Sequence, residues 1–410
     1  MNCKAPRQKS VLMIAYTNYR SDPRVIRAAE AAVGAGFDVD FIVLRQAGEP
    51  AQELIRGVRV LHLNQSRYRG GGVLRYMLSY LEFFLRCFLK TTSLQFSRRY
   101  VAVHVNNMPD FFVFAALLPK CMGAKVLLDI HDPMPNTFAS KFKSGESSFF
   151  FKILLWQEKL SAAFADQILT VHEPVKRYIL VKQHKIPAEA IEVVANFPDD
   201  ELFALREPGQ PADRIRAVFH GSILERYGLR NAMLALSRMR HQDRITVKII
   251  GEGDFSEELK NLITSLNLSA IVQFDNRMYP LHQIPALLAD CNLGLVPLEM
   301  SSITKYALPL KLLEYLSIGI PSVTVRNAAI SYYFSGDDCL FYEPDDPDSL
   351  RVILDRLAVT PSLLAHYQRR AVALRQKFLW SNEKKRYVAL LRKLTQQNSN
   401  ATSDAFHGIH

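Results

Sequence analysis

The sequence predicts an α/β protein of two doubly wound, Rossmann-like domains that face each other across a cleft. Short apolar runs with strand composition alternate with helical patterns through both halves, and this alternation is interrupted once, near residue 200. The chain has 410 residues, which is long for a single α/β core. Each half is therefore large enough to bury a core of its own.

The apolar runs have the length and composition of buried strands. In the first half they are VLMIAY, DVDFIVL, VRVLHL, YVAVHV, KVLLDI and QILTV. In the second half they are RAVFHGS, TVKIIGEG, AIVQFDN, LGLVPL and PSVTV. Helical patterns between them give the spacing of βαβ units, so we expect a parallel sheet in each half.

Three prolines, Pro198, Pro208 and Pro211, mark the break between the halves. We therefore expect an N-terminal domain over residues 1–198 and a C-terminal domain over residues 199–379. The stretch WSNEKKRYVALLRKL predicts a terminal helix over residues 380–394, and residues 395–410 have the composition of a polar tail.

The composition is that of an ordinary globular protein, with 49% hydrophobic and 22% charged residues. The five cysteines include no C-x-x-C pair, which argues against a zinc site or a disulfide framework and favours a reducing compartment. The polar, basic N-terminus lacks the apolar region of a signal peptide. These features predict a cytoplasmic protein.

Positive charge is concentrated in the N-terminal half. Residues 1–198 hold 26 Lys and Arg against 16 Asp and Glu, whereas residues 199–410 hold 25 against 24. A nucleic acid is one possible partner for such a surface, but no helix-turn-helix, zinc or RNA-binding signature accompanies it. An anionic membrane surface explains the charge better, and we expect no nucleic-acid partner.

Seven of these basic residues lie between Arg67 and Arg99, together with one acid, Glu82. The segment predicts a helix on which Arg75, Glu82 and neighbouring polar residues share a narrow face while apolar residues cover much of the rest. Its charges argue against a membrane span and are compatible with an interfacial helix. A helix buried against the sheet, with its basic face in water, has the same pattern.

The segment TKYALPLKLLEYLSIGIP, residues 304–321, is the most informative one for function. It predicts a turn, a helix that starts after Pro309 and a stop at Gly319 before the strand SVTV. A helix N-terminus can bind a diphosphate, and a glutamate one turn on, Glu314, can accept hydrogen bonds from a ribose. Lys311 can add a positive charge. A core helix whose Glu314 pairs with a lysine is the structural alternative.

Two further groups lie at the predicted carboxyl ends of strands, where open α/β sheets bind ligands. His131 and Asp132 follow KVLLDI, so the histidine can donate to a sugar hydroxyl while a carboxylate fixes its tautomer. Gly221 ends RAVFHGS, and the next turn carries Arg226, which can neutralise a diphosphate. Loop ordering for His131 and a surface ion pair for Arg226 are the alternatives.

Four segments together resemble glycosyltransferase family 4, which has the GT-B fold. They are VLMIAYTNYRSDPRVIRAAEAAVGAGFDVDFIVL, LLDIHDPMPNTFASKF, AVFHGSILERYGLRNAMLAL and YALPLKLLEYLSIGIPSV. The chain is similar to a subfamily with an ALPxKLxEY-like donor motif. The resemblance implies retention of anomeric configuration, contact of His131 with the donor sugar, a ribose contact for Glu314, and a terminal helix that returns to the first domain.

The sequence departs from the family pattern at two places. The usual E-x7-E pair would begin at position 306, where this chain has Tyr306, so the residue implied to contact the donor sugar is replaced. Arg226 is a near-match to the phosphate-binding Arg and Lys of the family, because Ser222 and Tyr227 stand where those often fall.

The resemblance also marks further cleft residues. Arg24 begins a helix that Ser21 or Asp22 can cap, with Pro23 just inside it, and the family loop there approaches donor or acceptor. Glu173 lies in a similar loop of the first half. The nucleotide base is expected near Arg277 and Met278.

We expect no metal ion and no other cofactor. Asp38 and Asp40 have D-x-D spacing but alternate within a predicted strand, which indicates a structural role rather than metal binding. Arg226, Lys311 and a helix dipole are expected to replace the ion.

The predicted function is metal-independent, retaining transfer of a sugar from a nucleoside diphosphate sugar, with UDP as the expected nucleotide, to a glycan or polyprenyl-linked acceptor. A peripheral location on the inner membrane face fits the basic half. The alternatives are a sugar-nucleotide epimerase of the same fold, a catalytically silent nucleotide-sugar-binding scaffold suggested by Tyr306, and a lipid-bound nucleic-acid protein.

Overall fold

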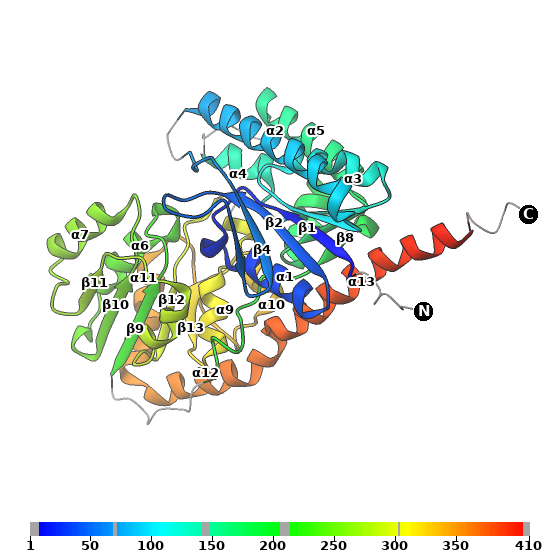
Figure 1. Ribbon diagram of the computed structural model, residues 1–410. Coiled ribbons are helices and arrows are strands. Elements are labelled where there is room, and N and C mark those ends of the chain that lie inside the picture. The colour runs from blue at the N-terminus through cyan, green and yellow to red at the C-terminus, as the bar shows by residue number, and fades with distance from the viewer. Residues whose placement is uncertain (1–7, 69–71, 142–146, 206–213, 302–303, 405–410) are drawn as a thin grey trace, which may run out of the picture. The chain divides into compact units, whose positions relative to one another are not determined.

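The computed structural model describes residues 8–68, 72–141, 147–205, 214–301 and 304–404 (Figure 1). The chain divides into two compact units, one of Met1–Ala195 with Glu383–His410 and the other of Asn196–Asn382. The division falls at Ala195, three residues before the expected break. Each unit is an α/β body with its own parallel sheet, which is the predicted fold class.

The first unit contains an eight-stranded sheet in the order β3-β4-β2-β1-β5-β6-β7-β8, parallel except for the edge pair β3 and β4. Its strands are β1 Ser10–Ile14, β2 Asp38–Leu44, β3 Gln52–Ile55, β4 Val58–Leu63, β5 Ala102–Asn106, β6 Lys125–Ile130, β7 Gln167–Thr170 and β8 Ile191–Val193. Every residue of the central strand β1 is buried, as expected for a strand covered on both faces.

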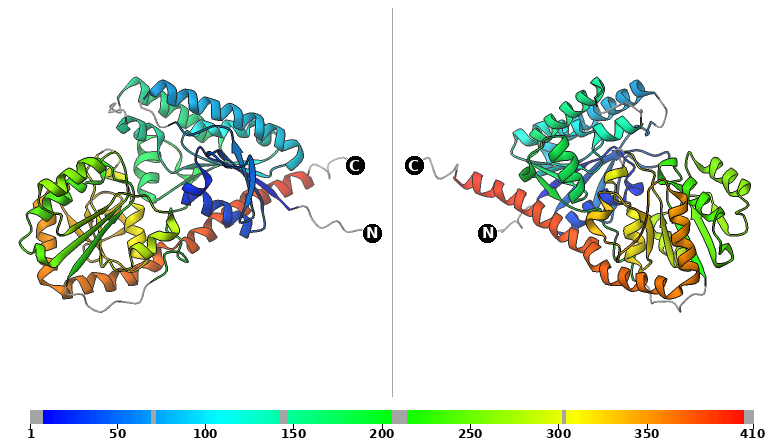
Figure 2. Two further views of the ribbon diagram at one scale, coloured as in Figure 1. Left: turned by 60° about the vertical axis from the view of Figure 1, so that its left-hand side comes forward. Right: turned by 180° about the vertical axis from the view of Figure 1, so that it is seen from behind.

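The helices that connect the parallel strands lie on both faces of the sheet. In Figures 1 and 2, α2, α3, α4 and α5 cover one face, and α1 and α13 lie on the other. Their bounds are α1 Pro23–Gly34, α2 Val73–Arg98, α3 Leu117–Cys121, α4 Met134–Lys141, α5 Phe149–Phe164 and α13 Trp380–Asp404; the 3-10 helix η2 spans Asp110–Ala116 and the π-helix η3 Val175–Gln183. In the part of the chain that the structure describes, no helix is both long enough and apolar enough to span a bilayer.

The second unit contains a six-stranded parallel sheet in the order β11-β10-β9-β12-β13-β14. The strands are β9 Ile215–His220, β10 Ile245–Ile250, β11 Val272–Asp275, β12 Leu293–Val296, β13 Ser322–Val325 and β14 Leu340–Tyr342. The helices are α6 Leu229–Ser237, α7 Ser256–Ser265, α8 Ile284–Leu287, α9 Leu310–Ser317, α10 Ile330–Tyr333, α11 Pro347–Val359 and α12 Pro361–Leu374. Helix α11 packs on α6, and α12 packs on α9.

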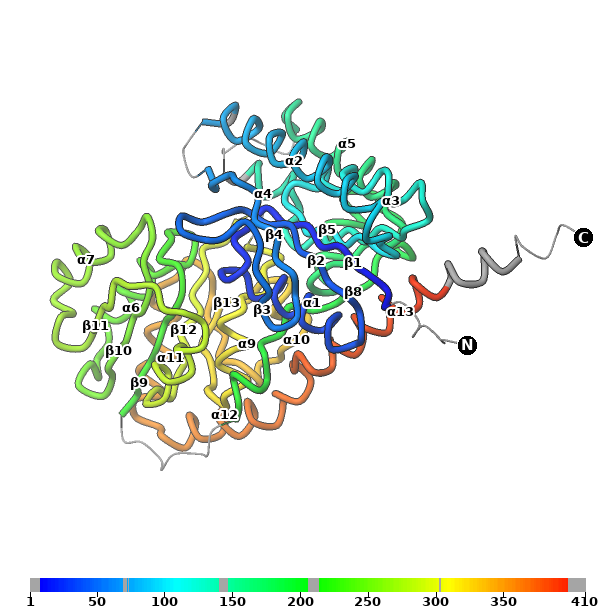
Figure 3. Tube along the Cα trace, in the orientation of Figure 1, coloured from blue at the N-terminus to red at the C-terminus, as the bar shows by residue number. Residues whose placement is uncertain are grey.

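The terminal helix is longer than predicted. The trace in Figure 3 runs from the second unit into α13. This helix ends at Asp404, so residues 395–404 of the expected polar tail are helical, and residues 405–410 lie outside the described residues. The segment contains no proline or glycine to end the helix, and Lys9 Nζ donates to the carbonyl of Thr395 at 2.9 Å. The helix joins the first unit through Tyr387, whose hydroxyl lies 2.9 Å from His104 Nδ1.

Candidate functional site

Helix α9 of the second unit starts without a side-chain cap. The 3-10 turn η8, Thr304–Tyr306, leads through Pro309 into Leu310. Pro309 is the N-cap and forms no side-chain cap hydrogen bond. The first-turn N–H groups and the positive end of the helix dipole therefore lack a side-chain cap.

Lys311 projects from this first turn into an aromatic enclosure. Its Nζ lies 3.5 Å from the ring centroid of Phe219 and 4.3 Å from that of Tyr227. The Nζ atom is buried and has no hydrogen-bond partner among the described residues. Burial lowers the pKa of Lys311 to about 7, while the negative charge of Glu314 acts in the opposite direction. A buried ammonium group without a partner is suited to binding an anion.

Glu314, one turn further along, is also buried and belongs to a polar network with strand β9. Its Oε2 lies 2.7 Å from His220 Nε2, and His220 Nδ1 lies 2.9 Å from the Tyr315 hydroxyl. The partner of Glu314 is thus a histidine rather than the lysine of the structural alternative. The sequence analysis did not identify His220, although a polar residue that ends a buried strand immediately before Gly221 was a usable signal.

Two glycines let the ends of β9 and β10 approach this helix start closely. Gly221 has a φ of +106°, and a Cβ added there would meet the Lys311 ammonium at 3.9 Å. Gly251 has a φ of +143°, and a Cβ there would overlap the carbonyl oxygen of Gly221. Gly251 therefore serves the close packing of two backbone segments.

Gly251→Ala is therefore expected to destabilise the second unit by about 1–3 kcal/mol, because the new methyl group overlaps backbone and φ is strained. Thermal unfolding measures the change. Gly336→Ala is the matched control, since a Cβ there meets only an Arg326 atom at 3.9 Å. Equal melting temperatures for the two variants would contradict the close approach of Gly251 to the Gly221 carbonyl.

The other predicted residues of the second unit lie on its surface or at its edge. Arg226 is exposed, with its guanidinium 5.3 Å from the ring centroid of Tyr227, the ring that Lys311 also contacts. Arg277 pairs with Asp275 at 2.7 Å, and Met278 beside it is exposed. Tyr306 ends η8, with Lys305 Nζ 5.4 Å from its ring centroid. Arg226 thus belongs to the Lys311 cluster, whereas Arg277 is engaged by its own strand end.

In the first unit, His131 and Asp132 lie at the carboxyl end of β6, in a loop held by Asn107. The backbone N–H groups of His131 and Asp132 donate to Asn107 Oδ1 at 3.2 and 3.3 Å. His131 Nδ1 is buried and has no hydrogen-bond partner among the described residues, and Asp132 is exposed. The expected carboxylate that would fix the tautomer of His131 is therefore not found there. Asn107, which the sequence analysis missed, orders the loop.

Arg24 begins α1 and belongs to a buried ion pair. The predicted cap is confirmed, since Asp22 accepts from the Arg24 N–H at 3.2 Å and Pro23 occupies the first turn. The guanidinium, however, forms a buried two-bond pair with Asp129 at 2.7 and 2.8 Å and donates to the Val194 carbonyl. Burial alone would raise the pKa of Asp129, but the charge and hydrogen bonds of Arg24 outweigh it and hold this pKa well below its usual range.

Glu173 lies just before η3 and pairs with Arg177 at 3.1 Å, four residues on. His172 beside it is buried, and burial lowers its pKa to about 4, so its imidazole is neutral at physiological pH. These contacts order the start of η3.

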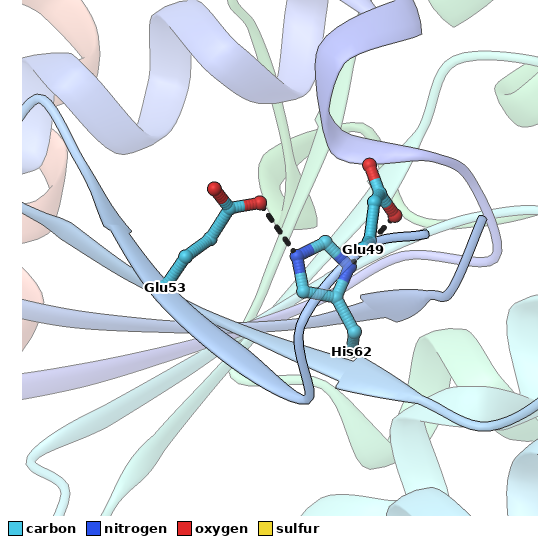
Figure 4. A group of neighbouring side chains, drawn as sticks. All are labelled: Glu49, Glu53 and His62. Atoms are coloured by element: carbon cyan, nitrogen blue, oxygen red, sulfur yellow. Dashed lines mark hydrogen bonds and ion pairs between the residues drawn. The ribbon is translucent and has the colours of Figure 1, made fainter. Parts of the chain in front are cut away.

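Two acidic groups bear on metal binding. Asp40 is fully buried and accepts from Arg59, Arg98 and Tyr100, which confirms its structural interpretation. Among the described residues, one group offers three metal-ligating side chains, Glu49, Glu53 and His62 (Figure 4). Glu49 approaches His62 Nδ1 at 3.2 Å and Glu53 approaches Nε2 at 3.0 Å, so the carboxylates sit at opposite edges of the ring. One ligand atom from each of the three side chains lies within 4.8 Å of the other two.

Two family models match the chain, one in each half. The Glycosyl transferase 4-like domain matches residues 22–196, and Glycosyl transferases group 1 matches residues 202–372. No curated protein sequence is significantly similar to this chain.

Solved structures share the fold at low sequence identity. Sucrose-phosphate synthase from Thermosynechococcus elongatus superimposes with a TM-score of 0.77 at 14% identity, covering 95% of this chain and 100% of that one. The Anabaena protein HepE in complex with UDP-glucose gives 0.70 at 14% identity over 94% and 99% of the two chains. The α,α-trehalose 6-phosphate synthase from Burkholderia multivorans gives 0.69 at 14% identity over 96% and 98%. With a glycosyltransferase model on each half and this fold throughout, the chain belongs to the GT-B glycosyltransferases.

Proposed function

We propose that the enzyme transfers a sugar from a nucleoside diphosphate sugar, with UDP as the expected nucleotide, to a hydroxyl group of a glycan or lipid-linked glycan. Retention of anomeric configuration is proposed from the family resemblance. The observation that carries the donor site is the buried, unpartnered Nζ of Lys311 at the uncapped start of α9, beside Gly221.

Each part of this cluster has a role in the proposed reaction. The Lys311 ammonium and the N–H groups of α9 would neutralise the charge that develops on the departing diphosphate. Glu314, held by His220, would accept hydrogen bonds from the ribose. Exposed Arg226 would add a second cation at the edge of the cluster. His131 of the first unit is proposed to contact the donor sugar, as the resemblance implies.

The donor class has support from related folds. The Anabaena protein HepE was solved with UDP-glucose, and a trehalose-6-phosphate protein from E. coli was solved with UDP-2-fluoro glucose. We propose that transfer here needs no metal, with the Lys311 ammonium and the N-terminus of α9 balancing the charge of the diphosphate.

The donor site can be tested by thermal unfolding with UDP, GDP, CDP, ADP and TDP, each with and without EDTA. A nucleotide at a hundred times its dissociation constant is expected to stabilise the protein by about 2.7 kcal/mol. One nucleotide should stabilise in the presence of EDTA and lose its effect in Glu314→Ala. No stabilisation by any of them would contradict the donor site, and stabilisation that EDTA abolishes would contradict metal independence.

A catalytically silent binding protein is the second candidate, because Tyr306 stands in place of the first glutamate of the donor motif. Nucleotide-sugar binding without hydrolysis or transfer across broad acceptor panels would favour it. Formation of an altered nucleotide sugar without acceptor would instead indicate an epimerase.

The basic N-terminal half is proposed to contact an anionic membrane surface, which would bring the enzyme to a polyprenyl-linked acceptor at the inner membrane face.

A further inference from the structure

We propose that the outward faces of α2 and α5 form one bilayer-docking surface, whose apolar side chains enter the interface of an anionic membrane. This inference rests on the proposed membrane partner and gives it a definite surface, and it is independent of the transfer reaction. Helix α5 had no part in the sequence-based expectation.

Helix α2 carries two apolar stripes. One is buried and includes Tyr80, Phe83 and Cys87, and it packs the helix on its own unit. The second consists of five leucines with 48–72% of each side chain exposed: Leu74, Leu78, Leu81, Leu85 and Leu89. Their spacing of three or four residues puts them on one side of the helix. A helix that only covers a sheet needs the first stripe and not the second.

Helix α5 repeats this arrangement. Phe151 and Leu154 are buried against the unit. Phe149, Ile153, Trp156 and Leu160 lie four, three and four residues apart and are 42–79% exposed. A tryptophan on such a stripe suits the membrane interface, where its ring can be buried while its N–H stays near water.

The two exposed stripes face the same way. Both helices contact η2, and both views of Figure 2 show them side by side over one face of the eight-stranded sheet. Because their buried stripes face the unit, their exposed stripes point away from it. Both stripes therefore lie on the outer side of the helices that cover this face of the sheet.

The charges beside the stripes identify the occupant. Exposed Arg75 and Lys90 lie on α2, and exposed Lys152 and Lys159 lie on α5. The exposed acid on α2, Glu82, is paired with Arg86 at 2.8 Å. A positive border around an apolar surface complements anionic lipid headgroups, whereas a second copy of this chain would present the same charge and be repelled.

A pocket of about 1090 Å³ adjoins the N-terminal end of α2. Arg45, Arg67 and Arg75 line it together with Gln65 and Leu78, so Arg75 and Leu78 belong both to the pocket and to the docking surface. Docking through α2 would therefore hold this arginine-lined pocket at headgroup level, where a lipid-carried acceptor presents its polar head.

The test is co-sedimentation of the full chain with vesicles of phosphatidylcholine alone or with added phosphatidylglycerol. Binding is expected with phosphatidylglycerol, weakened by salt. The double variant Leu85→Gln and Leu89→Gln should lower partitioning by about 10²-fold, because each leucine loses the free energy of apolar burial. Leu54→Gln is the matched control: Leu54 is 73% exposed, like Leu89 at 69%, but lies on strand β3.

Tryptophan emission gives a second readout, because the chain has two tryptophans and Trp380 is buried. A blue shift on adding anionic vesicles should persist in Trp380→Phe and vanish in Trp156→Phe. The docking surface would be refuted by absence of vesicle binding, by equal loss in Leu54→Gln, or by self-association that the leucine variants relieve.

The same preparations separate this proposal from the donor site. Glu314→Ala should keep vesicle binding, and the leucine double variant should keep stabilisation by nucleotide. Vesicle binding without stabilisation by any nucleotide would support the docking surface and contradict the proposed function. Stabilisation by a nucleotide without vesicle binding would contradict the docking surface alone.

Discussion

Lys311→Met is expected to lower kcat/KM by about 10²–10³-fold and to weaken binding of the nucleoside diphosphate. The Lys311 Nζ is buried between Phe219 and Tyr227 with no hydrogen-bond partner among the described residues. A diphosphate would supply the missing acceptor at the point where negative charge develops on the leaving group. Methionine fills a similar volume without the charge, so packing of the aromatic enclosure should survive.

The affinity for the nucleotide should depend on pH in a direction that identifies Lys311. Its pKa of about 7 means that the side chain becomes neutral as pH rises above 7, and a bound anion favours the protonated form. Binding above pH 7 must then take up a proton, and affinity should fall by about tenfold per pH unit. Titration calorimetry in two buffers of different ionisation enthalpy measures this proton uptake.

Lys260→Met is the matched control, because Lys260 is an exposed lysine of the same unit paired with Glu257. It should keep wild-type affinity and the same pH profile. A Lys311→Met variant that still takes up a proton on binding would show that another group carries the linkage, and unchanged kcat/KM would remove Lys311 from the donor site.

The alternation of elements could be predicted because their apolar runs are long and bounded. DVDFIVL, VRVLHL and KVLLDI coincide with β2, β4 and β6. Strands β3, β8 and β14 were missed. They have three or four residues, and β3 and β8 lie at sheet edges with exposed positions, so their sequences lack a sustained apolar run.

Residues of the site could be predicted where function depends on local order along the chain. Pro309, Lys311 and Glu314 follow one another in a turn and a helix, and their geometry is a property of that segment. His220 could not be paired with Glu314 in the same way, because the two are 94 residues apart and meet only when β9 lies beside β12 and α9 covers them. Asn107 binds the backbone of His131 from 24 residues away, so its role could not be predicted from the sequence for the same reason.

The ion pair of Arg24 was also beyond reach of the sequence. The position of this arginine at the start of a helix after the first strand is compatible with a ligand contact or with a core ion pair. The sequence alone does not indicate which carboxylate lies within reach of the Arg24 guanidinium. In the structure that carboxylate is Asp129 on β6, 105 residues away. Because both partners are buried, neither can lose its counter-charge to water without leaving an unpaired charge in the core.

Removing one partner, as in Arg24→Met or Asp129→Asn, is expected to destabilise the first unit by about 3–5 kcal/mol, because it leaves the other buried group without its counter-charge. Arg20→Met is the matched control, since Arg20 pairs with Glu53 at 2.6 Å, close to the 2.7 Å of the buried pair, but its side chain is 60% exposed. That exposed pair should be worth at most about 1 kcal/mol. Hydrogen exchange in urea, read on peptides from α1 and β6, measures both changes within the first unit.

Lowering the pH should also distinguish the buried Arg24–Asp129 pair from the exposed Arg20–Glu53 pair. Because the folded-state pKa of Asp129 is depressed, its stabilisation is fully present above the unfolded pKa of about 4 and is lost as pH falls below that value. Wild-type protein should therefore lose protection of β6 below about pH 4, while Asp129→Asn, already destabilised, should show a shallower loss. If Arg24→Met and Arg20→Met had equal effects, or if Asp129→Asn retained the wild-type acid profile, the pair would not be the stabilising contact that its burial implies.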